Sequence, residues 1–268
     1  MSESTIYNGR IFANLLNRKY VDAVMHCDKH GDVQSSYFID DKGEKVWDMC
    51  PECSKEHEQE LLKKQRQEDL EKQKLIWRNS NIKDKFFDMT FDDYEVVNDT
   101  QRLAKEKLQA IAKGGNRSLL LLGSNGLGKT MLSSLALMQR GGYIFKMYEI
   151  IIQIKSSYKS NSEVDESDIL KMLSECPLLV IDEVGKQFGS ESEKNWLSYV
   201  IDERYERGLP IVLISNLKLM KECTEEERKE GLYIERYLGR DSVSRLIECA
   251  DIVTIEGEDY RRKKPLTD

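Results

Sequence analysis

The sequence predicts an α/β protein in which helices cover a parallel sheet, preceded by a small metal-binding module and a charged linker helix. Three observations predict this arrangement. Apolar strand-like runs alternate with helical segments from about residue 85, a complete phosphate-binding loop follows the first run, and paired metal-ligating residues lie before residue 54. Such alternation is typical of a parallel sheet covered on both faces. We therefore expect an N-terminal helix and zinc-binding domain in residues 1–53, a helical linker in 54–84 and the main domain in 85–268.

The chain has 268 residues, which suffices for one large core and a small accessory module. Hydrophobic residues make up 40% and charged residues 33%, a balance typical of folded rather than disordered proteins. No apolar run approaches the ~20 residues of a membrane helix, and the first ten residues do not resemble a signal peptide. We therefore expect a cytoplasmic protein, in which cysteines are more often metal ligands than disulfides. Its net charge of −7 argues against DNA as the sole partner, because proteins that coat DNA are usually basic.

Five short apolar runs are the expected strands, and segments of helical length separate them. These runs are residues 118–122, 143–145, 178–182, 211–215 and 252–255. Residues 54–78 are dominated by acids and bases that alternate at helical offsets. That pattern indicates a solvated helix connecting two domains.

The strongest motif is a full phosphate-binding loop between the run 118–122 and the helical segment MLSSLALMQ. Its glycines allow backbone N–H groups to wrap phosphates closely, and the following helix N-terminus adds a positive dipole. Lys129 is expected to reach the β- and γ-phosphates, and the Thr130 hydroxyl is expected to bind Mg²⁺. The expected nucleotide contacts are Gly123, Ser124, Asn125, Gly126, Leu127, Gly128, Lys129 and Thr130.

Polar side chains also follow two later strands. Asp182 and Glu183 end the run LLVIDE, and Asn216 directly follows the run 211–215. In open α/β sheets, ligands bind at the carboxyl ends of the strands. We therefore expect Asp182 to hold Mg²⁺, directly or through water, and Glu183 to be the general base for an attacking water. Asn216 is a candidate for orienting that water, although asparagine after a strand is usually a turn former.

Together these motifs resemble the AAA+ ATPases, and specifically the DnaC/DnaI-like replicative helicase loaders, which are related to the IstB-like transposition helper ATPases. The resemblance covers about residues 80–262 and rests on SNGLGKT, LLVIDEVG, ISNL, LGRDSVSRL and the closing EDYRR. It implies a five-stranded parallel sheet in the order 5-1-4-3-2. It also implies a self-assembling ATPase that places a ring-shaped replicative helicase on single-stranded DNA.

The resemblance further assigns roles to individual residues. Arg245 matches the arginine finger that reaches a neighbouring subunit's γ-phosphate, with Arg240 as the competing candidate, and Arg261 matches a second sensor that touches nucleotide in its own subunit. A planar cation suits a position where transition-state charge develops. Lys155 and Tyr158 match DNA-contacting positions, as does Ser190 more loosely. A lysine beside an aromatic suits phosphate contact and base stacking, but an ordinary amphipathic helix is equally compatible with this segment.

Two pairs of potential zinc ligands lie nineteen residues apart near the N-terminus. They are Cys27 with His30 and Cys50 with Cys53, and each pair has a two-residue spacer. This is the pattern of a tetrahedral structural Zn²⁺ site, with Gly31 and Pro51 favouring the turns. His26 and His57 are possible substitutes for His30. Cys176, Cys223 and Cys249 are scattered and are expected to be structural.

Residues 11–16 contain an apolar stripe at near-helical spacing, formed by Ile11, Phe12, Leu15 and Leu16. It either docks in a partner's groove or folds back on the zinc module. Some loaders resemble this arrangement and contact the helicase through an N-terminal zinc domain, so the resemblance implies the same partner here.

Two other functions stay open. A transposition helper ATPase would share the core, but the zinc module favours the loader. A nucleotide-binding adaptor with little turnover is disfavoured by the intact pair Asp182 and Glu183. The sequence leaves open the particular helicase, a cellular or viral host, and the size of the assembly.

Overall fold

The computed structural model describes residues 19–159, 163–186 and 190–260, except for the side chains of Arg240 and Asp241. The chain divides into two compact units, Met1–Gln73 and Lys74–Asp268. The apolar stripe of residues 11–16 lies outside the described residues. Within the described part of the chain, no helix is long and apolar enough to cross a membrane.

The first unit contains a three-stranded antiparallel sheet in the order β1-β2-β3, which the sequence did not predict. Its strands are β1 (Val21–Cys27), β2 (Gly31–Ile39) and β3 (Lys45–Trp47). The tight β1–β2 turn places Cys27 opposite Gly31, whose φ of 71° suits glycine. The zinc-binding domain expected in residues 1–53 thus contains strands for which no sequence pattern was recognised.

Helix α2 (Pro51–Asn79) follows this sheet, and none of its 29 residues is buried. The prediction of an exposed, charged helix is therefore confirmed. The helix begins three residues earlier than expected, because Pro51 occupies its first turn instead of forming a turn. Proline is favoured there, since its fixed φ suits a helix and its missing N–H would have no intrahelical partner.

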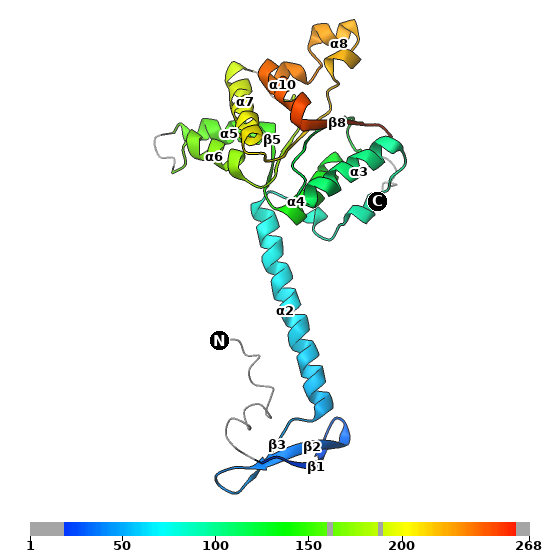
Figure 1. Ribbon diagram of the computed structural model, residues 1–268, viewed down its shortest axis with the longest axis vertical. Helices are drawn as coiled ribbons and strands as arrows, with labels where there is room; N and C mark the ends of the chain where they lie inside the picture. The colour runs from blue at the N-terminus through cyan, green and yellow to red at the C-terminus, as the bar shows by residue number, and fades with distance from the viewer. Residues whose placement is uncertain (1–18, 160–162, 187–189, 261–268) are drawn as a thin grey trace, which may run out of the picture. The chain divides into compact units, whose positions relative to one another are not determined.

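The second unit is built on a five-stranded parallel sheet in the order β5-β6-β7-β4-β8 (Figure 1). Numbered by their occurrence in this sheet and read from β8, the strands follow the predicted order 5-1-4-3-2. They are β4 (Ser118–Gly123), β5 (Tyr143–Lys146), β6 (Leu179–Asp182), β7 (Ile211–Ser215) and β8 (Ala250–Ile255). Strand β8 begins two residues earlier than expected. Asp251 is tolerated in this edge strand because Lys107 and Arg117 neutralise it at 3.0 and 3.2 Å.

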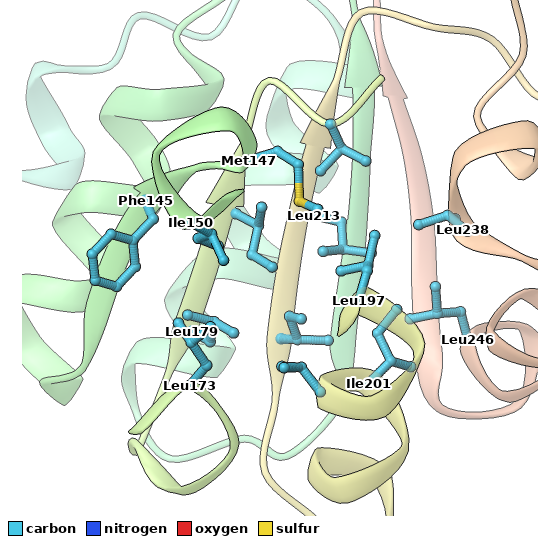
Figure 2. Close-up of a cluster of buried hydrophobic side chains, with 14 of the residues drawn as sticks. Phe145, Met147, Ile150, Leu173, Leu179, Leu197, Ile201, Leu213, Leu238 and Leu246 are labelled. Atoms are coloured by element: carbon cyan, nitrogen blue, oxygen red, sulfur yellow. The ribbon is translucent and has the colours of Figure 1, made fainter. Parts of the chain in front are cut away.

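Helices cover both faces of this sheet, and alternate strand residues supply the two apolar cores. One face carries α5 (Met147–Ser157), α6 (Glu166–Glu175), α7 (Glu191–Glu206), α9 (Glu235–Leu238) and α10 (Arg240–Cys249). Figure 2 shows this core, where Met147, Leu197 and Leu246 converge on strand residues such as Leu213. The other face carries α3 (Asp99–Ala112), α4 (Lys129–Arg140) and the short turns η2 (Asp84–Phe86) and η3 (Phe91–Asp93). Turn η4 (Met220–Glu222) and helix α8 (Glu225–Glu230) connect β7 to α9.

Candidate nucleotide-binding and metal-binding sites

The phosphate-binding loop joins β4 to α4 as the sequence predicted. Gly126 and Gly128 have φ values of 79° and 77°, a conformation that disfavours residues with a Cβ. A Cβ on Gly128 would lie 2.5 Å from the Tyr94 ring, and one on Gly126 would overlap the Asp259 carboxylate. Conformation therefore favours glycine at both positions, and at Gly128 the buried Tyr94 ring also leaves no space for a side chain.

Lys129 begins α4, and its ammonium group lies beneath the loop. It donates hydrogen bonds to the carbonyl oxygens of Gly123 and Ser124 at 2.7 and 2.6 Å, and to Asn216 Oδ1 at 3.1 Å. Asn216 Nδ2 in turn donates to Asn125 Oδ1 at 2.7 Å. The loop, its lysine and the amide after β7 thus form one network at the carboxyl edge of the sheet.

Thr130 and Asp182 meet across this edge. The Thr130 hydroxyl donates to Asp182 Oδ2 at 2.6 Å, and the Glu183 N–H donates to Asp182 Oδ1 at 2.7 Å. Asp182 is buried. Its carboxylate and the Thr130 hydroxyl therefore converge beside the phosphate-binding loop, with little access for water. Hard oxygen donors of this kind fit Mg²⁺, which binds through few protein ligands and the nucleotide's phosphates.

Glu183 directly follows β6 in the left-handed region, with φ of 60°. Such a conformation costs roughly 1–3 kcal/mol in a non-glycine residue and is characteristic of functional sites. Its carboxylate lies 3.3 Å from Lys146 Nζ and 3.2 Å from Lys186 Nζ. Partial burial opposes ionisation, but these two lysines outweigh it and hold the pKa of Glu183 below its ordinary value. The group is therefore ionised near neutral pH, as a general base must be.

A cavity of about 460 Å³ and a neighbouring one of about 560 Å³ flank this network, and both include Thr130 and Asp182 in their walls. The larger one also contains two tyrosines that the sequence did not single out. Tyr94 donates from its hydroxyl to the Leu127 carbonyl at 3.0 Å, and burial raises its pKa. The backbone N–H of Tyr260 donates to the Gly126 carbonyl at 3.1 Å. These contacts hold the phosphate-binding loop from the side opposite β7.

The four predicted zinc ligands come together in the first unit. Their candidate ligand atoms in Cys27, His30, Cys50 and Cys53 all lie within 4.8 Å of one another. The Cys27 and Cys53 sulfurs are 3.6 Å apart, and His30 Nδ1 lies 3.3–3.7 Å from the three sulfurs. A tetrahedral zinc with Zn–S bonds of about 2.3 Å separates its sulfurs by about 3.8 Å. The cluster therefore has the dimensions of a zinc site, whereas His26 pairs with Asp32 instead.

Two thiols of this cluster have pKa values that are shifted in opposite directions. The hydrogen bond with Cys27, followed by burial, raises the pKa of the Cys53 thiol to about 11. The backbone N–H groups of Lys29 and His30, followed by the His30 side chain, lower the pKa of the Cys27 thiol to about 6. Glu56 Oε1 lies 3.4 Å from His30 Nε2, and Lys29 pairs with the Glu56 carboxylate. A carboxylate on the outer nitrogen of a metal-binding histidine fixes its tautomer and ring orientation. Glu56 has this position, and no sequence motif pointed to it.

Arg245 is not part of the described hydrogen-bond network of the phosphate-binding loop. Arg245 on α10 is about one-third exposed and forms an ion pair with Asp202 of α7. Arg240 begins the same helix directly after Gly239. Arg245 is not among the described residues that line the larger cavity. Arg261 lies outside the described residues.

The predicted DNA contacts lie around α5 and the start of α7. Lys155 is exposed on α5, and its Nζ lies 4.0 Å from Glu193 Oε1. Ser190 is the N-cap of α7, and its hydroxyl accepts from the Glu193 N–H at 3.4 Å. Tyr158 is exposed at the C-cap of α5, and its hydroxyl hydrogen-bonds to the Glu166 carboxylate. Lys155 and Ser190 thus both contact Glu193, while the Tyr158 hydroxyl contacts Glu166 of α6.

Comparison with known proteins identifies the family of this chain. The family profile described as IstB-like ATP binding protein matches residues 53–267. The chain belongs to the IstB-like ATP-binding protein family. This family description agrees with the phosphate-binding loop of the second unit, so the chain is an ATP-binding protein of the P-loop type.

Among curated relatives of this family member, several are named replicative helicase loader DnaC. The protein of Buchnera aphidicola subsp. Acyrthosiphon pisum is 27% identical over 156 residues, which cover 55% of this chain and 63% of that protein. The Escherichia coli K12 protein is 28% identical over 162 residues, covering 58% of this chain and 65% of that protein. The alignments thus span less than two thirds of the length of these relatives.

Two solved structures have a fold similar to that of this chain. A crystal structure of the DnaC helicase loader matches with a TM-score of 0.53 at 22% identity, covering 65% of this chain and 100% of that one. A crystal structure of DnaI matches with a TM-score of 0.50 at 19% identity, covering 65% and 95%. These similarities show that the second unit has the AAA+ fold that the sequence predicted.

Proposed function

We propose that this protein is an ATP-hydrolysing loader that binds a ring-shaped replicative helicase and places it on single-stranded DNA. The observation that carries the proposal is the geometry of the ATP site, in which Thr130 contacts Asp182 and an ionised Glu183 lies directly beside it. The similarity to proteins named replicative helicase loader DnaC supports the assignment of this ATP site to helicase loading. Because a helicase loader acts where DNA is replicated, we place this activity in the cytoplasm.

The side chains of the site have distinct roles in the proposed hydrolysis. Lys129 and the loop N–H groups bind the β- and γ-phosphates, and Asn216 lies close enough to Lys129 to contact the γ-phosphate or the attacking water. Glu183 takes the proton from that water. Thr130 and Asp182 would hold Mg²⁺, which neutralises charge on the phosphates when bound. Arg245 of a neighbouring copy completes the site, and Arg261 contacts the nucleotide within its own chain.

We assign a structural role to the zinc cluster. All four positions of a tetrahedral ion would be filled by Cys27, His30, Cys50 and Cys53, which leaves no open position for catalysis. A small antiparallel sheet with no large core depends on a structural metal ion for its stability. The domain division that follows is a helicase-contacting module in residues 1–53, the linker 54–84 and the ATPase in 85–268.

Elemental analysis of the purified protein is expected to find one zinc ion per chain. The double change Cys50→Ser and Cys53→Ser should remove the zinc ion. Residues 21–47 should then unfold, because the ion no longer stabilises the sheet. Glu56→Gln should retain zinc but lower its affinity about 10- to 100-fold, the usual effect of removing such a partner of a metal-binding histidine. Circular dichroism and chelator competition measure both changes, with Glu60→Gln on the same helix as the control. A zinc-free wild type with an ordered sheet would refute the assignment.

The second candidate, a transposition helper ATPase, is favoured by the family match itself. The two functions differ in partner, so affinity purification of the tagged protein from its own host separates them. We expect the replicative helicase to co-purify with the full chain and to be lost from the Cys50→Ser, Cys53→Ser variant. Recovery of a transposase in place of the helicase would favour the helper function.

A further inference from the structure

The smaller of the two cavities beside the ATP site has a polar rim to which the proposed function gives no role. Its volume is about 460 Å³, many times the roughly 30 Å³ that one water molecule occupies. The buried side chains in its wall are Ile82, Phe86, Ser134, Ile144 and Phe145. The exposed side chains at its rim include Arg78, Asn81, Lys83 and Gln153. The cavity therefore has room for a hydrated ion and a polar opening to the solvent.

The two cavities meet at Thr130 and Asp182, which line both of them. Residues 125–129 of the phosphate-binding loop line the larger cavity, but none of them is among the described residues that line the smaller one. A nucleotide held by the loop therefore belongs in the larger cavity. After hydrolysis, ADP keeps its β-phosphate on the loop, so the larger cavity is still filled when the inorganic phosphate has to leave.

Three acids line the smaller cavity, and each of them is engaged. Asp84 accepts hydrogen bonds from the Arg78 guanidinium at 2.8–3.2 Å. Glu149 accepts the backbone N–H that directly precedes α5 at 2.9 Å. Asp182 accepts from the Thr130 hydroxyl. These contacts reduce the repulsion that the acids would exert on an anion.

The free charge in this cavity is a cation. Lys146 is paired with Glu183, but Lys83 forms no ion pair with any described residue, and it lines both cavities. The Ser134 hydroxyl and the Gln153 amide add neutral donors to the wall. One cation with neutral donors suits an anion in transit, because a passage must bind its ion weakly enough to let it go. A guanidinium from a neighbouring chain would instead need a free carboxylate.

We propose that the inorganic phosphate formed by ATP hydrolysis leaves through the smaller cavity, where Lys83 and the Gln153 amide bind it in passing. The proposal rests on the ATP hydrolysis in the proposed function and adds no chemical step. It gives Lys83 a role in product release and none in the cleavage of ATP.

The first test measures the binding of inorganic phosphate to the full chain saturated with Mg²⁺ and ADP, by phosphorus NMR. Lys83→Ala is expected to raise the Kd about 10-fold or more, because a hydrogen bond from a charged group is lost, and Lys83→Arg should restore binding. Gln153→Trp should abolish binding because the indole fills the opening. Gln153→Ala should weaken binding less than Lys83→Ala, since it loses only a neutral hydrogen bond. Lys171→Ala, which removes an exposed lysine on α6, should bind as wild type.

The second test separates cleavage from release in single turnovers. Acid-quenched samples report the phosphate formed, and a fluorescent phosphate sensor reports the phosphate released. In Gln153→Trp the rate of formation should equal that of wild type, and release should lag behind formation. Gln153→Ala should show no lag, and thermal melting checks that both variants keep the fold.

Three results would overturn the proposal. The first is a wild-type ADP complex that hydrolyses ATP yet binds no inorganic phosphate. The second is undiminished phosphate binding in Gln153→Trp, with formation and release coinciding. The third is slower formation of phosphate in Gln153→Trp without weaker phosphate binding, which would assign the cavity to the chemical step. Failure of the wild type to hydrolyse ATP would instead count against the proposed function itself.

Discussion

Glu183→Gln is expected to retain ATP binding and to lose ATP hydrolysis, whereas Lys129→Ala is expected to lose binding itself. Glu183 touches Lys146 and Lys186 but makes no contact with the loop in the described structure, so its amide analogue leaves the phosphate contacts intact. Loss of a general base reduces turnover about 10²- to 10⁴-fold. Lys129, in contrast, lies inside the loop network, and its removal deletes the cation that faces the phosphates.

Two measurements separate these effects. Titration with a fluorescent ATP analogue gives binding, and phosphate release under single-turnover conditions gives the chemical step. Lys171→Ala, which removes an exposed lysine on α6, is the control for loss of a positive charge. Equal turnover in Glu183→Gln and wild type would show that the base is a different residue.

Arg245→Ala is expected to abolish hydrolysis in assemblies while each subunit still binds ATP. An arginine supplied from a neighbouring subunit contributes about 10³- to 10⁵-fold to such reactions. Mixing Arg245→Ala with Lys129→Ala should restore part of the activity. In the mixed interfaces one subunit supplies an intact ATP site and the other supplies the arginine.

The ion pair with Asp202 provides a control for this experiment. If Arg245 only joins α10 to α7, Asp202→Asn should be as damaging as Arg245→Ala. If Arg245 acts on a neighbour, Asp202→Asn should keep or increase turnover because it frees the guanidinium. Arg240→Ala tests the competing candidate. Failure of the mixture to recover activity, with mixed assemblies confirmed, would contradict the assignment of Arg245.

The sequence predicted the parts of the fold and ATP site that local patterns determine. Apolar runs predicted the five strands, and the loop motif placed Lys129 and Thr130 at the start of a helix. The contact of Thr130 with Asp182 followed from the rule that strands of a parallel sheet end at one edge. The strand order itself came from the family resemblance, because strand periodicity does not encode it.

Other features depend on tertiary contacts that no local pattern reveals. Tyr94 reaches the loop from 33 residues away, and no local pattern shows that the C-cap of η3 hydrogen-bonds to Leu127. Lys146 ends a short strand, and only the pairing of β5 with β6 brings it to Glu183. The sheet of the first unit was missed because its strands alternate irregularly between polar and apolar residues. There, strand pairing and the ligand cluster outweigh local propensity.

The most direct test of the loader function uses a covalently closed circle of single-stranded DNA. A closed ring helicase cannot thread onto such a circle, so its retention requires that the ring be opened. We expect the replicative helicase of the same genome to be retained on the circle, after gel filtration, only with this protein and ATP. The Lys129→Ala variant should fail, and the Lys171→Ala variant should succeed. Equal retention of the helicase with and without the protein would contradict the account.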